Sequence, residues 1–394
     1  MNSDTQPVQE PTITNREAIA TRFGFLILGL AASTWAPLVP LVKARLSLTD
    51  AQLGFLILAI GIGSVLTMPF AGSLAHRYGC RKVLIASCLV LLTSVPLIPL
   101  APSYLVLGVV LLVYGGVLGS LDVVINLQGV QVENALSRPL MSGFHGFYSL
   151  GGIVGAGAAT ILLSAGSSAF GATLATLVAG LAILIYAIPG FLTNAGEGDR
   201  LVFQIPRGVV LIIGILAGTV FCAEGSVTDW SALLLTREYR LTSGLAGFGY
   251  VAFASCMTLG RLTGDKIVAR LGPLKILLAG GAICVLGFWI AAASSVPFLG
   301  FLGFALVGLG ASNVVPVLFS ACGRQRVIPP HVALSIVTIM GYAGFLIGPA
   351  AIGEASHHLG IRVAMALIGV AVLLVPFFAS WIIRQTLGDD MVSS

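Results

Sequence analysis

The stretch GSLAHRYGCRKVL, residues 72–84, interrupts a strongly apolar sequence with His76, Arg77, Arg81 and Lys82. The runs on either side, ILAIGIGSVLTMPFA at 57–71 and LIASCLVLLTSVPLIPL at 84–100, contain no charged residue. A short basic loop between two apolar runs is typical of membrane proteins, in which such loops set the orientation of the spans. We therefore interpret this stretch as a loop between two membrane-spanning helices.

The composition leads to the same class of protein. Of the 394 residues, 57% are hydrophobic and only 9% are charged. Because a soluble domain carries roughly a quarter charged residues, we expect this chain to lie in a lipid bilayer. The net charge of +5 does not indicate nucleic-acid binding, since most cations fall in short loops between apolar runs. The six cysteines lack metal-ligand spacing, so we expect no disulfide and no metal site.

A membrane-spanning helix needs about 20 mostly apolar residues, and we predict twelve such segments. If both termini lie on one side, that side collects all of the 20 Lys and Arg residues except Lys43, Arg45, Arg237, Arg240 and Arg362. The positive-inside rule then places both termini in the cytoplasm. The predicted spans are 20–42, 51–74, 83–100, 103–128, 144–165, 169–192, 208–235, 243–263, 274–293, 296–320, 332–353 and 361–383.

The chain contains an internal repeat, in which residue 48 aligns with residue 241. LTDAQLGF (48–55) then falls on LTSGLAGF (241–248), and the same shift places Arg77 and Gly79 on Arg270 and Gly272. Each half has an even number of predicted spans, so both halves enter the membrane in the same direction.

The same shift aligns two pairs of glycines. Gly151 and Gly155 fall on Gly344 and Gly348. Small residues at this spacing let membrane helices approach closely, so we expect helix contacts at both pairs.

Two parallel six-helix halves with a basic loop after the second and eighth helices resemble the major facilitator superfamily. The stretch at 72–84 is similar to the signature of that family, a glycine and an acid followed by Arg-x-Gly-Arg-Lys. The resemblance covers nearly the whole chain and implies an all-α polytopic membrane protein with twelve transmembrane helices. The implied parts are a cytoplasmic N-terminal tail (1–19), an N-terminal six-helix bundle (20–193), a cytoplasmic linker (194–207), a C-terminal six-helix bundle (208–384) and a cytoplasmic C-terminal tail (385–394).

Shorter stretches resemble particular branches of the superfamily. SLDVVINLQG (120–129) and NVVPVLFSA (313–321) resemble stretches in helices four and ten of the fucose permease-like branch. HGFYSLG (145–151) and AEGSVTDW (223–230) resemble the YbjJ-type bacterial inner-membrane transporters. The superfamily carries sugars, drugs, ions and acids on one scaffold, so these resemblances imply the fold and not the substrate.

The basic loop departs from the family signature at the acid. His76 stands in the position of the acid, and Ala269 takes that position in the second copy. Asp265 lies one helical turn before Ala269 and could partly substitute, and we expect Arg261 to pair with Asp265. The contacts of the inner gate should be weaker than is usual for the family. The predicted gate residues are Gly72, His76, Arg77, Gly79, Arg81, Lys82, Arg261, Asp265 and Arg270.

Two acids within the spans are candidates for proton coupling, Asp122 and Glu224. A charged side chain inside a membrane is costly and usually functional. Asp122 shares a helical stripe with Asn126, and its segment contains no cation to pair with it, so we expect a proton to compensate its charge. The alternative is an acid that only holds neighbouring helices together through hydrogen bonds.

Neutral side chains complete the predicted binding site. An aromatic face beside a carboxylate can hold a sugar ring, although Trp is also an ordinary anchor at a membrane interface. His145 opens the fifth span, where capping or contact with water is the commoner role. The predicted substrate-binding residues are Thr34, Trp35, Asp122, Asn126, Tyr148, Asn313 and Tyr342.

The sequence contains no Walker loop, nucleophile–base pair or metal set at membrane depth, so we expect neither an enzyme nor a cofactor. The predicted function is secondary active transport of a small polar solute, sugar-like or polyol-like, by alternating access with proton coupling. An exporter of drugs or amphipathic metabolites and a non-transporting sensor are the alternatives. We expect a monomer in the cell inner membrane, with the substrate, a proton and the lipid bilayer as partners.

Overall fold

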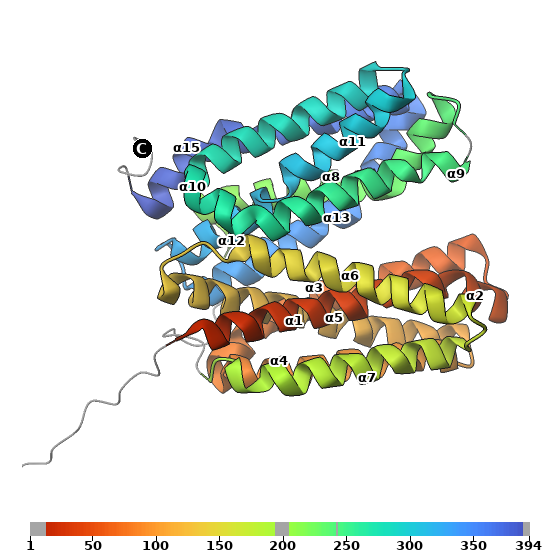
Figure 1. Ribbon diagram of the computed structural model, residues 1–394, viewed down its shortest axis with the longest axis horizontal. Coiled ribbons are helices and arrows are strands. Elements are labelled where there is room, and N and C mark those ends of the chain that lie inside the picture. The colour runs from red at the N-terminus through yellow and green to blue at the C-terminus, as the bar shows by residue number, and fades with distance from the viewer. Residues whose placement is uncertain (1–12, 194–204, 242, 389–394) are drawn as a thin grey trace, which may run out of the picture.

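The computed structural model describes residues 13–193, 205–241 and 243–388 (Figure 1). These residues are almost entirely helical, and they form no strand. The helices are α1 (Asn15–Thr34), η1 (Ala36–Leu38), α2 (Val39–Arg45), α3 (Asp50–Tyr78), α4 (Cys80–Leu100), α5 (Tyr104–Leu136), α6 (Met141–Ser164), α7 (Ala169–Ala187), η2 (Ile188–Gly190), α8 (Gly208–Arg237), α9 (Ser243–Ala246), α10 (Phe248–Ala293), α11 (Pro297–Ala311), α12 (Val314–Arg324), α13 (Pro330–Leu359), α14 (Ile361–Val372) and α15 (Leu374–Leu387).

Eleven helical stretches in the described residues are long and apolar enough to cross a membrane. One of them, α10, has 46 residues and contains a non-helical residue, Gly272. A continuous helix of that length would extend about 69 Å, more than twice the hydrocarbon thickness of a bilayer. α10 is therefore two spans that meet at Gly272, and the twelve predicted crossings are present.

Glycine sets the same sharp turn in both halves. Gly79 separates α3 from α4 with φ 85° and ψ 149°, and Gly272 divides α10 with φ 78° and ψ 159°. Residues with a Cβ adopt such positive φ values only at a cost in strain. The aligned positions of the sequence repeat thus share one backbone conformation, which returns the chain into the membrane.

The predicted start of the first span needs correction. α1 begins at Asn15, before the predicted span at 20, because Thr14 and Glu17 form a capping box that satisfies the first backbone N–H groups. α1 itself ends at Thr34, before Pro37, but η1 and α2 continue the apolar stretch to Arg45, past the predicted end at residue 42. The tail predicted at 1–19 is therefore helical from Asn15 onward. Residues 1–12, most of the predicted linker (194–204) and residues 389–394 lie outside the described part of the chain.

The predicted glycine contacts hold helix pairs together. A Cβ at Gly151 or Gly155 of α6 would collide with the backbone of α1, and a Cβ at Gly344 of α13 would collide with the Gly218 carbonyl of α8. The backbones of α1 and α6, and of α8 and α13, therefore approach at corresponding places in the two halves. Such close contact replaces the hydrophobic driving force that is missing between helices in lipid.

The helices form two groups, one from α1 to α7 and one from α8 to α15, which lie one above the other in Figure 1. The groups meet where α6 packs against α10 and α3 packs against α13. α1 begins and α15 ends at the same end of the molecule, on the left of Figure 1. We name this end, which carries the turns at Gly79 and Gly272, the basic end.

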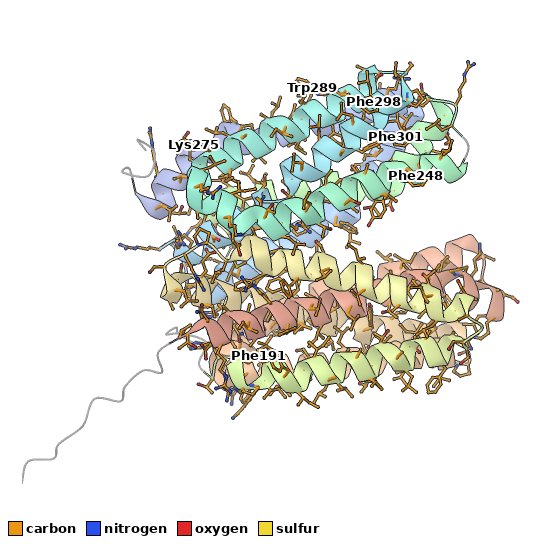
Figure 2. All side chains as sticks on the ribbon, viewed as in Figure 1. Phe191, Phe248, Lys275, Trp289, Phe298 and Phe301 are labelled. Atoms are coloured by element: carbon orange, nitrogen blue, oxygen red, sulfur yellow. The ribbon has the colours of Figure 1, made fainter. Side chains whose placement is uncertain are left out.

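Large apolar side chains cover much of the outer surface. Figure 2 labels Phe298 and Trp289 among them, which are 70% and 42% exposed. Leu105 and Phe377 are exposed to 76% and 77%. A water-soluble surface does not carry so many exposed large apolar side chains, so this surface fits contact with lipid tails.

Candidate functional site

A cavity of about 260 Å³ lies between the two groups of helices. Its walls come from α1, α5 and α6 of the first half and from α8, α10, α12 and α13 of the second. Aromatic rings and ionisable groups dominate the lining, which consists of Phe25, Leu118, Asp122, Asn126, His145, Tyr148, Phe221, Glu224, Arg261, Phe319, Tyr342 and Phe345.

Asp122 lies in this cavity with neutral polar partners. The Asn126 amide, one helical turn further along α5, donates to Asp122 Oδ1 at 2.9 Å and to the Asp122 carbonyl at 2.9 Å. The Tyr342 hydroxyl interacts with the same carboxylate from α13 of the other half. The carboxylate therefore contacts both halves of the protein. Its contact with Asn126 agrees with the predicted helical stripe that the two residues share.

Glu224 forms a buried ion pair in the same cavity. Arg261 Nη2 lies 3.1 Å from Glu224 Oε1, and their side chains are only 6% and 14% exposed. Arg261 also donates from Nη1 to Ser149 Oγ at 3.1 Å and from Nε to the Ser312 carbonyl at 3.3 Å. Because Ser149 lies on α6, this guanidinium also connects the two halves.

The predicted pairing of Arg261 with Asp265 is wrong for this conformation. The ion pair of Arg261 is with Glu224 in the cavity, whereas Asp265 lies nearer the basic end and faces Arg22 at 3.7 Å. Arg261 and Asp265 lie one turn apart on α10, close enough to pair, but the guanidinium of Arg261 extends to Glu224, Ser149 and Ser312. A cation inside an apolar run is itself a signal of a cavity residue, and the sequence analysis had assigned it to the gate.

His145 also belongs to the cavity, although capping or contact with water was the commoner expectation for a histidine at the start of a helix. Its ring lies between Phe25 and Phe319, at centroid distances of 5.1 and 5.8 Å. Its Nε2 is buried and has no hydrogen-bond partner, and the same holds for Asn126 Oδ1. The phenylalanines of the cavity were not singled out, because apolar residues in a span do not reveal which face they occupy.

Three predicted binding residues lie away from the cavity. The Thr34 hydroxyl donates to the Leu30 carbonyl at 2.7 Å and lies 3.2 Å from the Thr176 hydroxyl of α7. Trp35 packs against a separate apolar cluster that contains Leu38. Asn313 points its amide at the Gly260 carbonyl, 3.1 Å away. Tyr148 and Tyr342, in contrast, line the cavity as predicted.

Asp265 connects the two halves at the basic end. Its Oδ1 accepts a hydrogen bond at 2.7 Å from the backbone N–H of Gly143, which lies on α6. Its Oδ2 faces Arg22 of α1 at 3.7 Å. The acid one turn before Ala269 thus contacts the opposite half, the arrangement expected of a partial substitute for the family's acid.

The other predicted gate residues fall into different environments. His76 stacks on His331 of α13, and Gly72 lies against the His331 carbonyl, where a Cβ would collide. Arg81 stays within its own half, because Nε donates to the Phe191 carbonyl at 2.8 Å and Nη2 to the Pro189 carbonyl at 3.0 Å. The remaining cations of the predicted gate are exposed, namely Arg77, Lys82 and Arg270.

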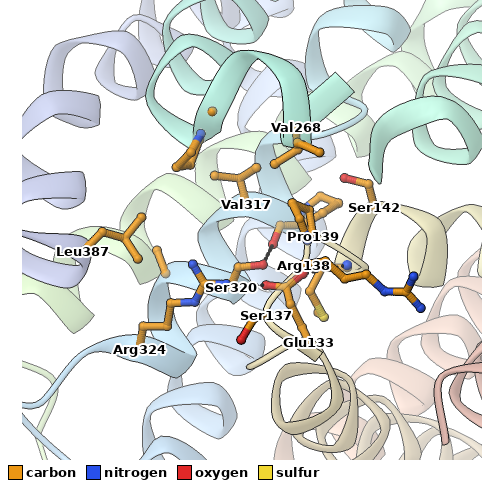
Figure 3. A pocket seen from close by; sticks show the side chains of 16 residues that line it. Glu133, Ser137, Arg138, Pro139, Ser142, Val268, Val317, Ser320, Arg324 and Leu387 are labelled. Carbon is orange, nitrogen blue, oxygen red and sulfur yellow. Dashed lines mark hydrogen bonds and ion pairs between the residues drawn. The ribbon is translucent and has the colours of Figure 1, made fainter. Parts of the chain in front are cut away.

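A second cavity, of about 420 Å³, lies at the basic end (Figure 3). Glu133 of α5 is 2% exposed and accepts backbone hydrogen bonds from Leu140 and Met141 at 2.7 and 3.0 Å. Its other oxygen faces Arg324 of α12 at 3.3 Å. Sequence analysis missed this contact between the halves, because the pairing joins residues 191 positions apart.

No group of three or more His, Cys, Asp or Glu side chains in the described residues is arranged to hold a metal ion. The polar groups of the central cavity are a carboxylate, an ion pair, an amide, an imidazole and two phenols. They can bind hydroxyl groups and exchange a proton, and both halves contribute to them.

The chain belongs to the Major Facilitator Superfamily, whose family model matches residues 22–326. An uncharacterized MFS-type transporter of Yersinia pestis is 44% identical over 380 residues, which cover 96% of this chain and 98% of that protein. Membrane protein MosC of Rhizobium meliloti is 31% identical over 376 residues, or 94% of this chain and 90% of MosC. The protein is thus a multi-pass membrane transporter and not an enzyme.

Solved structures support the same fold. The E. coli fucose:proton symporter FucP superposes with a TM-score of 0.76 at 18% identity, over 94% of this chain and 99% of FucP. FucP in the outward conformation gives a TM-score of 0.79, also at 18% identity, over 94% of this chain and 99% of that one. At this identity the likeness concerns the fold alone.

Proposed function

We propose that the protein is a secondary active transporter that moves a small polar solute, sugar-like or polyol-like, by alternating access. The observation that carries the proposal is Asp122, a carboxylate in a cavity between the two halves, with Asn126 and Tyr342 as its neutral polar partners. When a group that contacts both halves gains or loses a proton or a substrate, its contacts with both halves change. Rocking of the halves about such a central site is how this type of transporter alternates access.

Proton coupling through Asp122 follows from the cost of burying its charge. An ionised carboxylate away from water needs a cation, a proton or strong hydrogen bonds. Glu224 already has Arg261 as its cation at 3.1 Å, whereas the partners described for Asp122 are neutral. Asp122 is therefore the first candidate to load and release a proton, and Glu224 is the second.

The contacts at the basic end are those of a closed gate. Asp265 with Gly143, Glu133 with Arg324 and His76 with His331 each join the two halves. The excess of Lys and Arg near this end supports a cytoplasmic location for it and for both termini, in the cell inner membrane. We further propose a monomer with six-helix bundles near 20–193 and 208–384. Because the gate at the cytoplasmic end is closed, the described structure corresponds to an outward-facing state.

Export of amphipathic compounds is the alternative, and the four phenylalanines of the cavity favour it. Uptake into proteoliposomes distinguishes transport of a small polar solute from export of amphipathic compounds. We expect a neutral sugar or polyol to accumulate when the bath is more acidic than the lumen, and accumulation to collapse with a protonophore. Uphill movement of an amphipathic dye, with no uptake of any sugar, polyol or acid, would replace the proposal by its alternative.

A further inference from the structure

We propose that His145 and Asn126 determine substrate specificity and that the cargo is an uncharged ring compound with at least two hydroxyl groups. The inference rests on the proposed transport function and narrows its substrate class. It adds that the sugar-like or polyol-like solute is an uncharged ring, and it names the two side chains that bind its hydroxyl groups.

The first argument is a pair of buried polar atoms without partners. His145 is 8% exposed and Asn126 is fully buried, yet His145 Nε2 and Asn126 Oδ1 have no hydrogen-bond partner. Both residues line the central cavity. A buried polar atom without a partner is costly, so sites that retain such atoms commonly pair them with a ligand. A hydroxyl group can donate to the amide oxygen, and a second hydroxyl can pair with the imidazole nitrogen.

The second argument concerns charge. Each of the three guanidinium nitrogens of Arg261 already has an acceptor, on Glu224, Ser149 or Ser312. A carboxylate on the cargo would have to share this guanidinium with Glu224, whose negative charge would repel it. An ammonium group would have to compete with Arg261 for Glu224, or take the place of the proton that the proposed coupling puts on Asp122. A neutral cargo leaves these pairs intact and can form hydrogen bonds with His145 Nε2 and Asn126 Oδ1, which have no partner in the protein.

The third argument is shape. His145 lies between the rings of Phe25 and Phe319, and Phe221 and Phe345 add apolar wall on the other half. The cavity of about 260 Å³ is smaller than the range of about 300 to 1,000 Å³ that is usual for drug-sized ligands. A single ring with apolar C–H faces and a hydroxylated edge fits such walls.

The test is binding to purified protein, read by thermal stabilisation and by competition, so that neither transport nor a proton gradient is needed. The probes are neutral hexoses, pentoses and cyclic polyols, then the carboxylate, amine and monodeoxy counterparts of each compound that binds. We expect a neutral compound to bind and its charged counterparts to bind at least tenfold more weakly. One monodeoxy analogue should lose about fivefold to tenfold in affinity, the value of one hydrogen bond.

His145→Phe keeps an aromatic ring between Phe25 and Phe319 but removes Nε2. This variant should bind the parent compound and that monodeoxy analogue equally, whereas His145→Gln should restore the discrimination. The matched control is His357→Phe, at a histidine exposed outside the cavity. Melting curves without ligand check that each variant is folded.

Two outcomes overturn the inference. One is a charged compound that binds more tightly than every neutral probe, or a panel in which no neutral ring binds. The other is a His145→Phe variant that discriminates against the deoxy analogue as the unchanged protein does. Uphill transport of an acid or amine in proteoliposomes would remove this inference, while secondary active transport by alternating access would stand. Binding of a neutral ring without any transport would instead remove the transport function.

Discussion

His76 of α3 and His331 of α13 stack face to face across the two halves, with ring centroids 5.1 Å apart and planes inclined by 8°. His76 Nδ1 and His331 Nε2 are both buried without a hydrogen-bond partner. His76 occupies the position of the family's gate acid, so a stack of two imidazole rings stands where the family signature has an acid.

Replacing His76 with Asp should strengthen the closed basic end, because a carboxylate can accept a hydrogen bond from His331. Labelling of a cysteine introduced at Ser320, which lines the cavity at the basic end, should slow by about twofold to fivefold, the range of a weak ion pair. His357→Asp is the control at an exposed site. Unchanged labelling in His76→Asp would mean that this position does not control the gate.

Asp122→Asn keeps the shape of the side chain and fixes it in a neutral state. If Asp122 couples transport to protons, the variant should lose accumulation against a gradient while exchange of internal for external substrate continues. The two activities are measured as pH-driven uptake and as counterflow in the same proteoliposomes. Accumulation that persists with its original pH dependence would transfer the coupling role to Glu224.

Arg261→Gln should destabilise the protein, because Glu224 then remains buried without its cation. Removal of one partner from a buried ion pair costs about 3 kcal/mol. The double variant Arg261→Gln, Glu224→Gln should recover part of that loss, and Arg237→Gln, at an exposed arginine, should have little effect. Thermal unfolding in detergent measures all four proteins, and equal melting temperatures throughout would show that the pair contributes no stability.

Gly272→Ala tests the turn between the two spans of α10. Nothing lies within 4 Å of an added Cβ there, so the cost comes from the positive φ of 78° alone. We expect a loss of about 1 to 2 kcal/mol in stability. Gly157→Ala is the matched control, because its added Cβ also meets nothing within 4 Å and its backbone is helical. If both substitutions had the same effect, backbone strain at Gly272 would not explain the turn.

The sequence by itself determined the class of protein and the number of crossings. The composition of a helix indicates whether lipid or water surrounds it, since a run of about 20 apolar residues without charge is typical of a membrane-spanning helix. The repeat that aligns Gly79 with Gly272 likewise predicted corresponding basic loops, and the structure places a turn with a positive φ at each of these glycines. Asp122 and Glu224 were placed in the site for a similar reason, as a charge in an apolar run needs a cavity.

Only the tertiary structure decided which partners these groups have. Arg261 pairs with Glu224 and not with Asp265, and Glu133 meets Arg324, because the packing of the two halves sets the distances between helices far apart in the sequence. Thr34 and Trp35 turn away from the cavity, while His145 turns into it between two phenylalanines. A helix in lipid can be apolar on every face, so its sequence does not state which face meets the cavity, and that choice is made by helix packing.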